Sequence, residues 1–184
     1  MDTDGVGGGQ VAVATVSVSI EPARQAELVE MMRLGDQFAL ELYPPEGCFL
    51  LDLSELESAG IEVFVAREAA AGAKIARHGS ERPALGMVAL IDNSDGTGEI
   101  KRMFVLESAR GRGVARALLD PLEARAAERG IRLLLLETGT EHTAAISLYL
   151  SLGYRRIARF GPYVDSEFSV CMEKQLGTPP QLRT

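Results

Sequence analysis

The chain has 184 residues, of which 46% are hydrophobic and 24% charged, and a formal net charge of −7. This length corresponds to one domain that can bury a core. The acidic balance argues against general nucleic-acid binding and favours a cationic partner such as an amine. No apolar run reaches the roughly 18 residues of a membrane span. The few cysteines and histidines have no disulfide or metal-ligand spacing, so we expect a cytoplasmic protein without nucleic-acid, membrane or metal partners.

The chain ends differ in composition from the middle. Residues 1–10 are rich in glycine and are expected to form a disordered tail. The domain itself should span residues 11–176, and residues 177–184, which include two adjacent prolines, should form a C-terminal tail.

The N-terminal half of the domain alternates between strand and helix signals. Period-two alternation predicts strands, apolar residues at helical spacing predict helices, and Pro and Gly mark the ends. The expected elements are a strand at Val11–Ile20, a helix from Pro22 to Tyr43-Pro44-Pro45, a short helix at Ser54–Ala59 with Ser54 as N-cap, a strand at Ile61–Glu68, a loop over residues 69–83 and a strand at Ala84–Ile91.

The C-terminal half predicts a hairpin followed by a strand–helix–strand unit. Residues 92–98 (DNSDGTG) are turn residues, so the next strand should run antiparallel to the preceding one. A long helix between two strands implies that those strands are parallel. The expected elements are strands at Glu99–Leu106 and Ile131–Leu136, helices at Gly111–Arg129 and Thr143–Leu152, and closing strands at Tyr154–Phe160 and Glu167–Lys174.

The segment from Met103 to Ala115 predicts an anion site. Gly111 and Gly113 allow a ligand to approach the backbone closely, and the helix that follows presents free N–H groups at its N-terminus. Arg110 and Arg112 add positive charge. The segment matches neither the P-loop pattern nor the GxGxxG dinucleotide pattern. A plain glycine-tolerant connection, or a nucleotide-binding α/β module, are the alternatives.

Three motifs in order narrow this interpretation. They are RxxGxA at Arg110, Gly113 and Ala115, then LLLLETG at Leu133–Gly139, then AAISLYLSLGYRRI at Ala144–Ile157. Together they resemble the acetyl-CoA signature, the following strand and the A-x-x-L-Y-x-x-x-G-F/Y element of the GNAT superfamily of N-acetyltransferases. The resemblance implies a single-domain α/β fold with a mixed, mostly antiparallel central sheet and helices on both faces. It also implies acetyl-CoA as co-substrate.

The resemblance assigns cofactor contacts to specific positions. The backbone of Met103 and Val105 would bind the pantetheine arm, and the Val105 N–H would polarise the thioester carbonyl. The pyrophosphate would lie against the loop and helix start, which comprise Arg110, Gly111, Arg112, Gly113, Val114 and Ala115. His142 stands where many family members have an Asn that contacts the cofactor.

The resemblance also suggests catalytic residues. Glu99 matches the position of a catalytic glutamate in histone-type members, and it is the candidate base that deprotonates the amine. Strand alternation puts Glu99, Lys101, Met103 and Val105 on one face. Tyr149 matches the tyrosine that many members use as general acid. The alternatives are a solvent-exposed Glu99 and a Tyr149 that only packs in the core.

Acceptor binding falls, by analogy with the family, to aromatic residues of the first helices and the last loop. Tyr43, Phe160 and Tyr163 are the candidates, and packing is the alternative role for each. The leading interpretation is an acetyl-CoA-dependent N-acetyltransferase that acts on a small-molecule amine. A protein or peptide N-acetyltransferase and a catalytically silent CoA-binding sensor remain alternatives. The sequence is compatible with a homodimer and does not determine the oligomeric state.

Overall fold

The computed structural model describes residues 16–69 and 82–177. The expected disordered tail at residues 1–10, the start of the first expected strand, residues 70–81 of the expected loop and residues 178–184 of the expected C-terminal tail lie outside the described residues.

Within the described ranges, one sheet contains seven strands in the order β1-β2-β3-β4-β5-β7-β6. The strands are β1 (Val16–Ile20), β2 (Ile61–Glu68), β3 (Ala84–Asp92), β4 (Thr97–Val105), β5 (Leu133–Gly139), β6 (Arg155–Arg156) and β7 (Ser169–Gln175). The pair β4–β5 is parallel and the other neighbouring pairs are antiparallel. Both the predicted hairpin of β3 with β4 and the predicted parallel pairing of β4 with β5 are confirmed.

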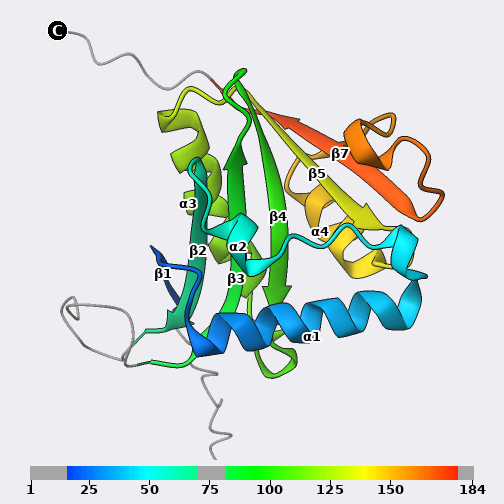
Figure 1. The fold of residues 1–184 in the computed structure, drawn as a ribbon. Helices are drawn as coiled ribbons and strands as arrows, with labels where there is room; N and C mark the ends of the chain where they lie inside the picture. The colour runs from blue at the N-terminus through cyan, green and yellow to red at the C-terminus, as the bar shows by residue number, and fades with distance from the viewer. Residues whose placement is uncertain (1–15, 70–81, 178–184) are drawn as a thin grey trace, which may run out of the picture.

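Helices cover both faces of this sheet (Figure 1). They are α1 (Ala26–Leu42), α2 (Leu53–Leu56), α3 (Val114–Glu128) and α4 (Thr143–Ser151), with 3-10 turns η1 (Pro45–Gly47), η3 (Glu107–Ala109) and η4 (Gly161–Tyr163). Helices α1 and α2 pack on one face, and α3 and α4 on the other. The fold is therefore the predicted α/β fold with a mixed, mostly antiparallel sheet.

Helix α3 buries the face that the sequence pattern predicts. Val114, Leu118, Leu122 and Ala126 are each at most 1% exposed. Pro121 lies inside the helix, which continues past it to Glu128. The next strand begins with four leucines, and α3 and β5 both contribute to an apolar cluster that also includes residues of β2, β3 and β4.

Several predicted elements have other bounds or caps in the structure; β5, for example, is Leu133–Gly139 and not Ile131–Leu136. Helix α1 begins at Ala26, not at Pro22. Helix α2 is capped by Asp52, not Ser54, because the Asp52 carboxylate and Glu55 form a capping box. The predicted strand at Tyr154–Phe160 shrinks to β6, whose residues pair with β7 at the end of the sheet order.

A β-bulge interrupts β4. Lys101 pairs with Ala89 and Phe104 pairs with Met87, so Arg102 and Met103 together lie opposite a single residue of β3. Arg102 has a positive φ of 55°. Its guanidinium bonds the carbonyl of Leu51 and the carboxylate of Asp36, which hold this uncommon conformation in place.

The bulge overturns one prediction about faces. Met103 and Val105 pack against the α3 side of the sheet, whereas Lys101 lies opposite Ala89, on the α1 side. Strict alternation would have kept Glu99, Lys101, Met103 and Val105 together. The extra residue of the bulge shifts the alternation of side chains between the two faces after Lys101. The four side chains therefore do not share a face.

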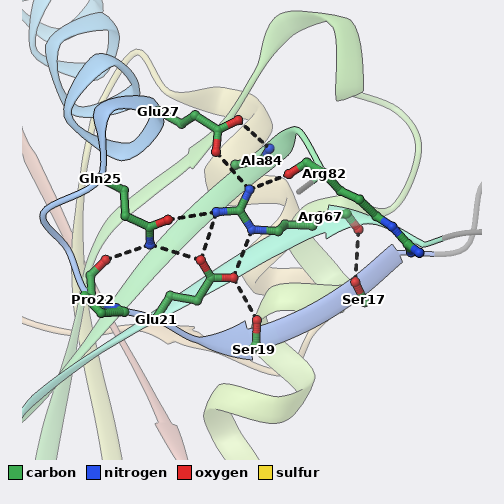
Figure 2. A network of polar contacts seen from close by, with 9 residues as sticks. All are labelled: Ser17, Ser19, Glu21, Pro22, Gln25, Glu27, Arg67, Arg82 and Ala84. Atoms are coloured by element: carbon green, nitrogen blue, oxygen red, sulfur yellow. Dashed lines mark hydrogen bonds and ion pairs between the residues drawn. The ribbon is translucent and has the colours of Figure 1, made fainter. Parts of the chain in front are cut away.

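A buried arginine connects α1 and the segment before it to the sheet (Figure 2). The Arg67 side chain is 3% exposed and pairs with Glu21 at 2.9 Å and Glu27 at 2.8 Å. It also donates to Gln25 at 3.0 Å and to the carbonyl of Arg82. These bonds connect the end of β2 with the chain that leads into α1, which forms one wall of the site described next.

Candidate active site

The strands β4 and β5 separate midway along the sheet. Their pairing runs from Thr97 with Leu133 to Ile100 with Leu136 and stops there. Figure 1 shows the two strands side by side at one end and diverging toward their C-terminal ends. Residues of β4 beyond Ile100 therefore have an edge without a strand partner in the described sheet.

A cavity of about 180 Å³ opens where the strands separate. It lies between α1, the segment after α1, β4, β5 and α4. Its walls comprise Met31, Met32, Gly35 and Ala39 of α1, then Tyr43, Gly47, Cys48, Phe49 and Leu50, Met87 of β3, Ile100–Phe104 of β4, Glu137–Gly139 of β5, and His142, Ala145 and Tyr149. The walls are mainly apolar, with a few polar groups, as is usual for small-molecule sites.

The unpartnered edge of β4 presents backbone groups to this gap. The Leu106 N–H donates to the Leu85 carbonyl of β3 at 2.9 Å, so the backbone groups of Val105 point away from β3. The Val105 carbonyl accepts a bond of 3.4 Å from Nε of Arg110. Met103 lines the cavity. This edge can therefore receive an extended ligand as an added strand.

The loop before α3 fits an anion. Gly111 and Gly113 have φ of 74° and 78°, and a Cβ built at either position would meet nothing within 4 Å. Gly113 is the N-cap of α3 and makes no side-chain capping bond, so the first N–H groups of the helix, from Val114 and Ala115, remain available. Arg110 is exposed, and Arg112 pairs with Glu68 at 3.2 Å.

Glu99 is held by Tyr163. The Tyr163 hydroxyl donates to Glu99 Oε1 at 2.5 Å and accepts from Lys101 Nζ at 2.8 Å. Lys101 Nζ also donates to the Phe49 carbonyl at 3.2 Å and lies 5.0 Å from the centre of the Tyr163 ring. Burial lowers the pKa of the Lys101 ammonium, while the charges of Glu99 and Glu137 oppose this change. The structure thus brings together Glu99 and Tyr163, which were predicted for separate tasks.

Glu137 is a carboxylate of the cavity wall that the sequence analysis did not single out. Burial raises the pKa of its carboxyl group, although a 2.7 Å hydrogen bond from Ser169 and the charge of Lys101 act in the opposite direction. Glu137 directly follows the apolar run of β5. A charged residue directly after a run of buried leucines is the sequence signal that could have identified Glu137.

His142 is the N-cap residue of α4, makes no side-chain capping bond and lines the cavity. Its ring stacks on Phe38 at 5.3 Å and meets the edge of Tyr43 at 5.5 Å. Nδ1 lies 3.3 Å from the Thr138 hydroxyl, and Nε2 is buried without a hydrogen-bond partner among the described residues. Burial lowers the pKa of His142, so the imidazole is neutral at neutral pH. An unsatisfied buried nitrogen in a cavity wall points to a polar ligand.

The remaining predicted aromatic residues occupy different places. Tyr149 is 4% exposed, lines the cavity and meets the ring of Tyr154 edge-on at 5.4 Å. Tyr43 also lines the cavity, and its hydroxyl accepts a 2.7 Å bond from the Glu141 N–H. The rings of Phe160 and Tyr163 pack with their centres 5.2 Å apart, and neither residue is among those that line the cavity.

Comparison with known proteins identifies this arrangement. Residues 33–154 match the Acetyltransferase (GNAT) family. The IAA acetyltransferase of Azospirillum brasilense is 37% identical over 161 residues, which cover 88% of this chain and 98% of that protein. The chain belongs to the GNAT family. It is therefore an acyltransferase, as the sequence motifs predicted.

Solved GNAT structures have the same fold. A Klebsiella pneumoniae protein, provisionally named acyl-CoA N-acyltransferase, aligns with a TM-score of 0.72 and 29% identity, over 89% of this chain and 99% of that one. The PaiA N-acetyltransferase of Thermoplasma acidophilum, solved with coenzyme A, has a TM-score of 0.63 and 15% identity, over 88% and 99% of the two chains. CoA binding thus occurs in proteins with this GNAT fold.

Two further findings concern only residues 16–69 and 82–177. No helix there is long and apolar enough to cross a membrane. No group of three or more His, Cys, Asp or Glu side chains in those ranges is arranged to hold a metal ion.

Proposed function

We propose that this GNAT protein transfers the acetyl group of acetyl-CoA to a primary amine of a small molecule by direct attack. The name of the related IAA acetyltransferase supports acetyl as the transferred group. The observation that carries the proposal is the cavity that opens where β4 and β5 separate, beside the edge of β4 that has no strand partner in the described sheet.

The residues on the cofactor side fit acetyl-CoA. The two positive-φ glycines leave open space above the backbone, where a pyrophosphate can accept N–H bonds from Val114 and Ala115. The backbone edge at Met103 and Val105 would bind pantetheine. The Val105 N–H would stabilise negative charge on the thioester oxygen, and an oxyanion donor of this kind contributes about 3 kcal/mol in acyl transfer.

The size of the cavity supports a small acceptor. Its volume of about 180 Å³ lies below the roughly 300–1,000 Å³ of pockets that hold drug-sized ligands. A peptide acceptor needs an open groove across the surface. Here Tyr43, Phe49 and Met87 form part of the apolar wall, which favours an amine with a short apolar body.

Both chemical steps of amine acetylation have candidate groups. An acceptor with a lysine-like pKa of about 10.4 arrives as an ammonium and must lose a proton before it attacks. The Glu137 carboxylate can attract this ammonium in the cavity, and Glu99 remains the proposed base. Tyr149, whose pKa is raised by burial and which therefore stays protonated, can donate a proton to the departing thiolate.

The test measures binding and turnover separately. Coenzyme A at about 100 times its Kd should stabilise the protein by roughly 2.7 kcal/mol in thermal unfolding. Free thiol released from acetyl-CoA in the presence of a panel of small primary amines should then identify acceptors. Stabilisation by coenzyme A without thiol release from any amine or peptide would support the silent CoA sensor and contradict the proposed reaction.

A further inference from the structure

Lys101, Tyr163 and Glu99 form a continuous hydrogen-bonded chain. Lys101 Nζ donates to the Tyr163 hydroxyl at 2.8 Å, and that hydroxyl donates to Glu99 Oε1 at 2.5 Å. Lys101 Nζ and Glu99 Oε1 are 3.8 Å apart, which is too far for a direct hydrogen bond. The phenol is therefore the link between the two charged groups.

The two ends of this chain face different surroundings. Lys101 lines the cavity, and its side chain is 8% exposed. Glu99 is absent from the cavity-lining residues of the described chain, and its side chain is 16% exposed. A base at Glu99 thus cannot contact an acceptor in the cavity directly, but Lys101 can.

Charged groups from several elements surround the chain. The pKa of Lys101 responds to the charges of Glu99 and Arg102 on β4, Glu55 on α2 and Glu137 on β5. The pKa of Tyr163 responds to Glu99, Glu137 and Cys171 of β7. Burial and the Glu99 carboxylate raise the pKa of Tyr163, so the phenol stays protonated and can only pass a proton on. The other titratable side chains in the cavity wall are Tyr43, Cys48, His142 and Tyr149.

We propose that Lys101, Tyr163 and Glu99 are a proton relay that deprotonates the acceptor ammonium, an inference that rests on the proposed N-acetyltransferase activity. The Tyr163 proton moves to Glu99 as the phenol oxygen takes a proton from Lys101. Lys101, now a neutral amine, takes a proton from the acceptor ammonium, whose nitrogen keeps its electron pair for attack. One proton has then left the acceptor and one has reached Glu99, which releases it to solvent. Lys101 and Tyr163 return to their starting forms.

In this relay Lys101 is the catalytic residue, since it touches the acceptor, and Tyr163 and Glu99 act through it. The test compares ethylamine with 2,2,2-trifluoroethylamine, which is similar in size but largely unprotonated at neutral pH because fluorine withdraws electrons. Tyr163→Phe keeps the ring contacts with Phe49 and Phe160 and removes the link. We expect it to lower kcat/KM for ethylamine roughly 10²-fold and for the fluorinated amine less than twofold.

A second variant tests the same step without removing the phenol. Lys101→Arg keeps a positive charge, but a guanidinium does not give up its proton. It should show the same selective loss with ethylamine. With both variants, the loss should shrink as pH rises toward the pKa of ethylamine, since the acceptor then arrives already deprotonated.

The protein contains a matched control. Tyr154 is also buried, donates to Glu123 at 3.0 Å and has the Lys174 ammonium 5.3 Å from its ring centre. This second Lys–Tyr–Glu set is outside the cavity lining. Tyr154→Phe should lower stability through the lost hydrogen bond but leave the ratio of the two amines unchanged.

The outcomes separate the relay from the proposed function. Equal losses with both amines, or no loss in Tyr163→Phe, would overturn the relay and leave the acetyltransferase reaction standing. Selective loss with ethylamine in Glu137→Gln but not in Tyr163→Phe would also overturn it, because Glu137 would then be the base. Absence of thiol release from the wild type with every amine would contradict the proposed function, and the relay with it.

Discussion

The Tyr163 hydroxyl donates a 2.5 Å hydrogen bond to Glu99, so a residue of η4 controls the candidate base on β4. Lys101 Nζ, on the cavity side, donates a 2.8 Å hydrogen bond to the same hydroxyl. The loop between β6 and β7 is therefore connected to the strand whose unpaired edge is the proposed binding site of the cofactor. Changes in this loop should affect proton transfer as well as acceptor binding.

Glu99 and Glu137 should affect different steady-state parameters. Glu99→Gln is expected to lower kcat for an ammonium acceptor by about 10²-fold, most strongly at low pH, with little change in KM. Glu137→Gln removes the charge that attracts the ammonium and should raise KM more than it lowers kcat. Thiol release measured from mildly acidic to alkaline pH gives both parameters. A Glu99→Gln enzyme with wild-type rates at all pH values would return Glu99 to a structural role.

The proposed binding of the pyrophosphate at the loop before α3 can be tested by comparing two glycines. Gly113 and Gly130 flank α3 with φ of 78° and 81°, and a Cβ at either position meets nothing within 4 Å. Alanine should therefore cost about the same at both, roughly 1–2 kcal/mol of backbone strain. Only Gly113→Ala puts a methyl group where the pyrophosphate is proposed to bind, so only this variant should weaken coenzyme A at least tenfold. Thermal unfolding with and without coenzyme A measures both effects.

An equal response of the two alanine variants to coenzyme A would place the pyrophosphate elsewhere. The comparison needs no correction for stability, since each variant is measured against its own unliganded form.

Local sequence patterns predicted those parts of the fold that local physics determines. The bounds of β2, the buried face of α3 and the glycine turn before it follow from periodicity and from the need for positive φ. The three family-like motifs predict a cofactor site at the edge of β4 and at the start of α3, and this remains a prediction. These features depend on neighbours in sequence, which is why the sequence suffices.

The acceptor side depends on contacts between distant residues, and the sequence did not show it. The bulge at Arg102 is held by Leu51 and Asp36, and no local signal in β4 announces a positive φ at an arginine. The bulge separates Lys101 from Met103, and the hydrogen bond from Tyr163 joins residues 64 positions apart. Alternation alone therefore could not predict which side chains share the cavity.

Tyr149 can be tested with a single-atom change. Tyr149→Phe keeps the buried ring against Tyr154 and removes only the hydroxyl. If the hydroxyl protonates the departing thiolate, kcat and kcat/KM should fall together, by about 10²-fold, while coenzyme A affinity and unfolding stay near wild type. Full turnover by the phenylalanine variant would leave solvent as the proton source and Tyr149 as a core residue.

The Arg67 network should stabilise the fold without touching the chemistry. Arg67→Met leaves the buried Glu21 carboxylate without its cation, and removing one partner of a buried pair typically costs about 3–5 kcal/mol. Urea unfolding at neutral pH measures the loss. Arg24→Met, which breaks the exposed pair with Glu57, is the control and should change little.

The same network should make the free energy of unfolding decrease as the pH falls. Burial alone raises the pKa of Glu21, but hydrogen bonds from Arg67, Gln25 and Ser19 together lower it below its ordinary value of 4.5. Because the folded-state pKa is the lower one, the stabilisation is complete above pH 4.5 and is lost as pH falls through the folded-state value. Glu21→Gln should therefore unfold more easily than the wild type at neutral pH, and the difference should narrow in acid. A constant difference between the two proteins across this range would show that Glu21 contributes packing and neutral hydrogen bonds rather than its charge.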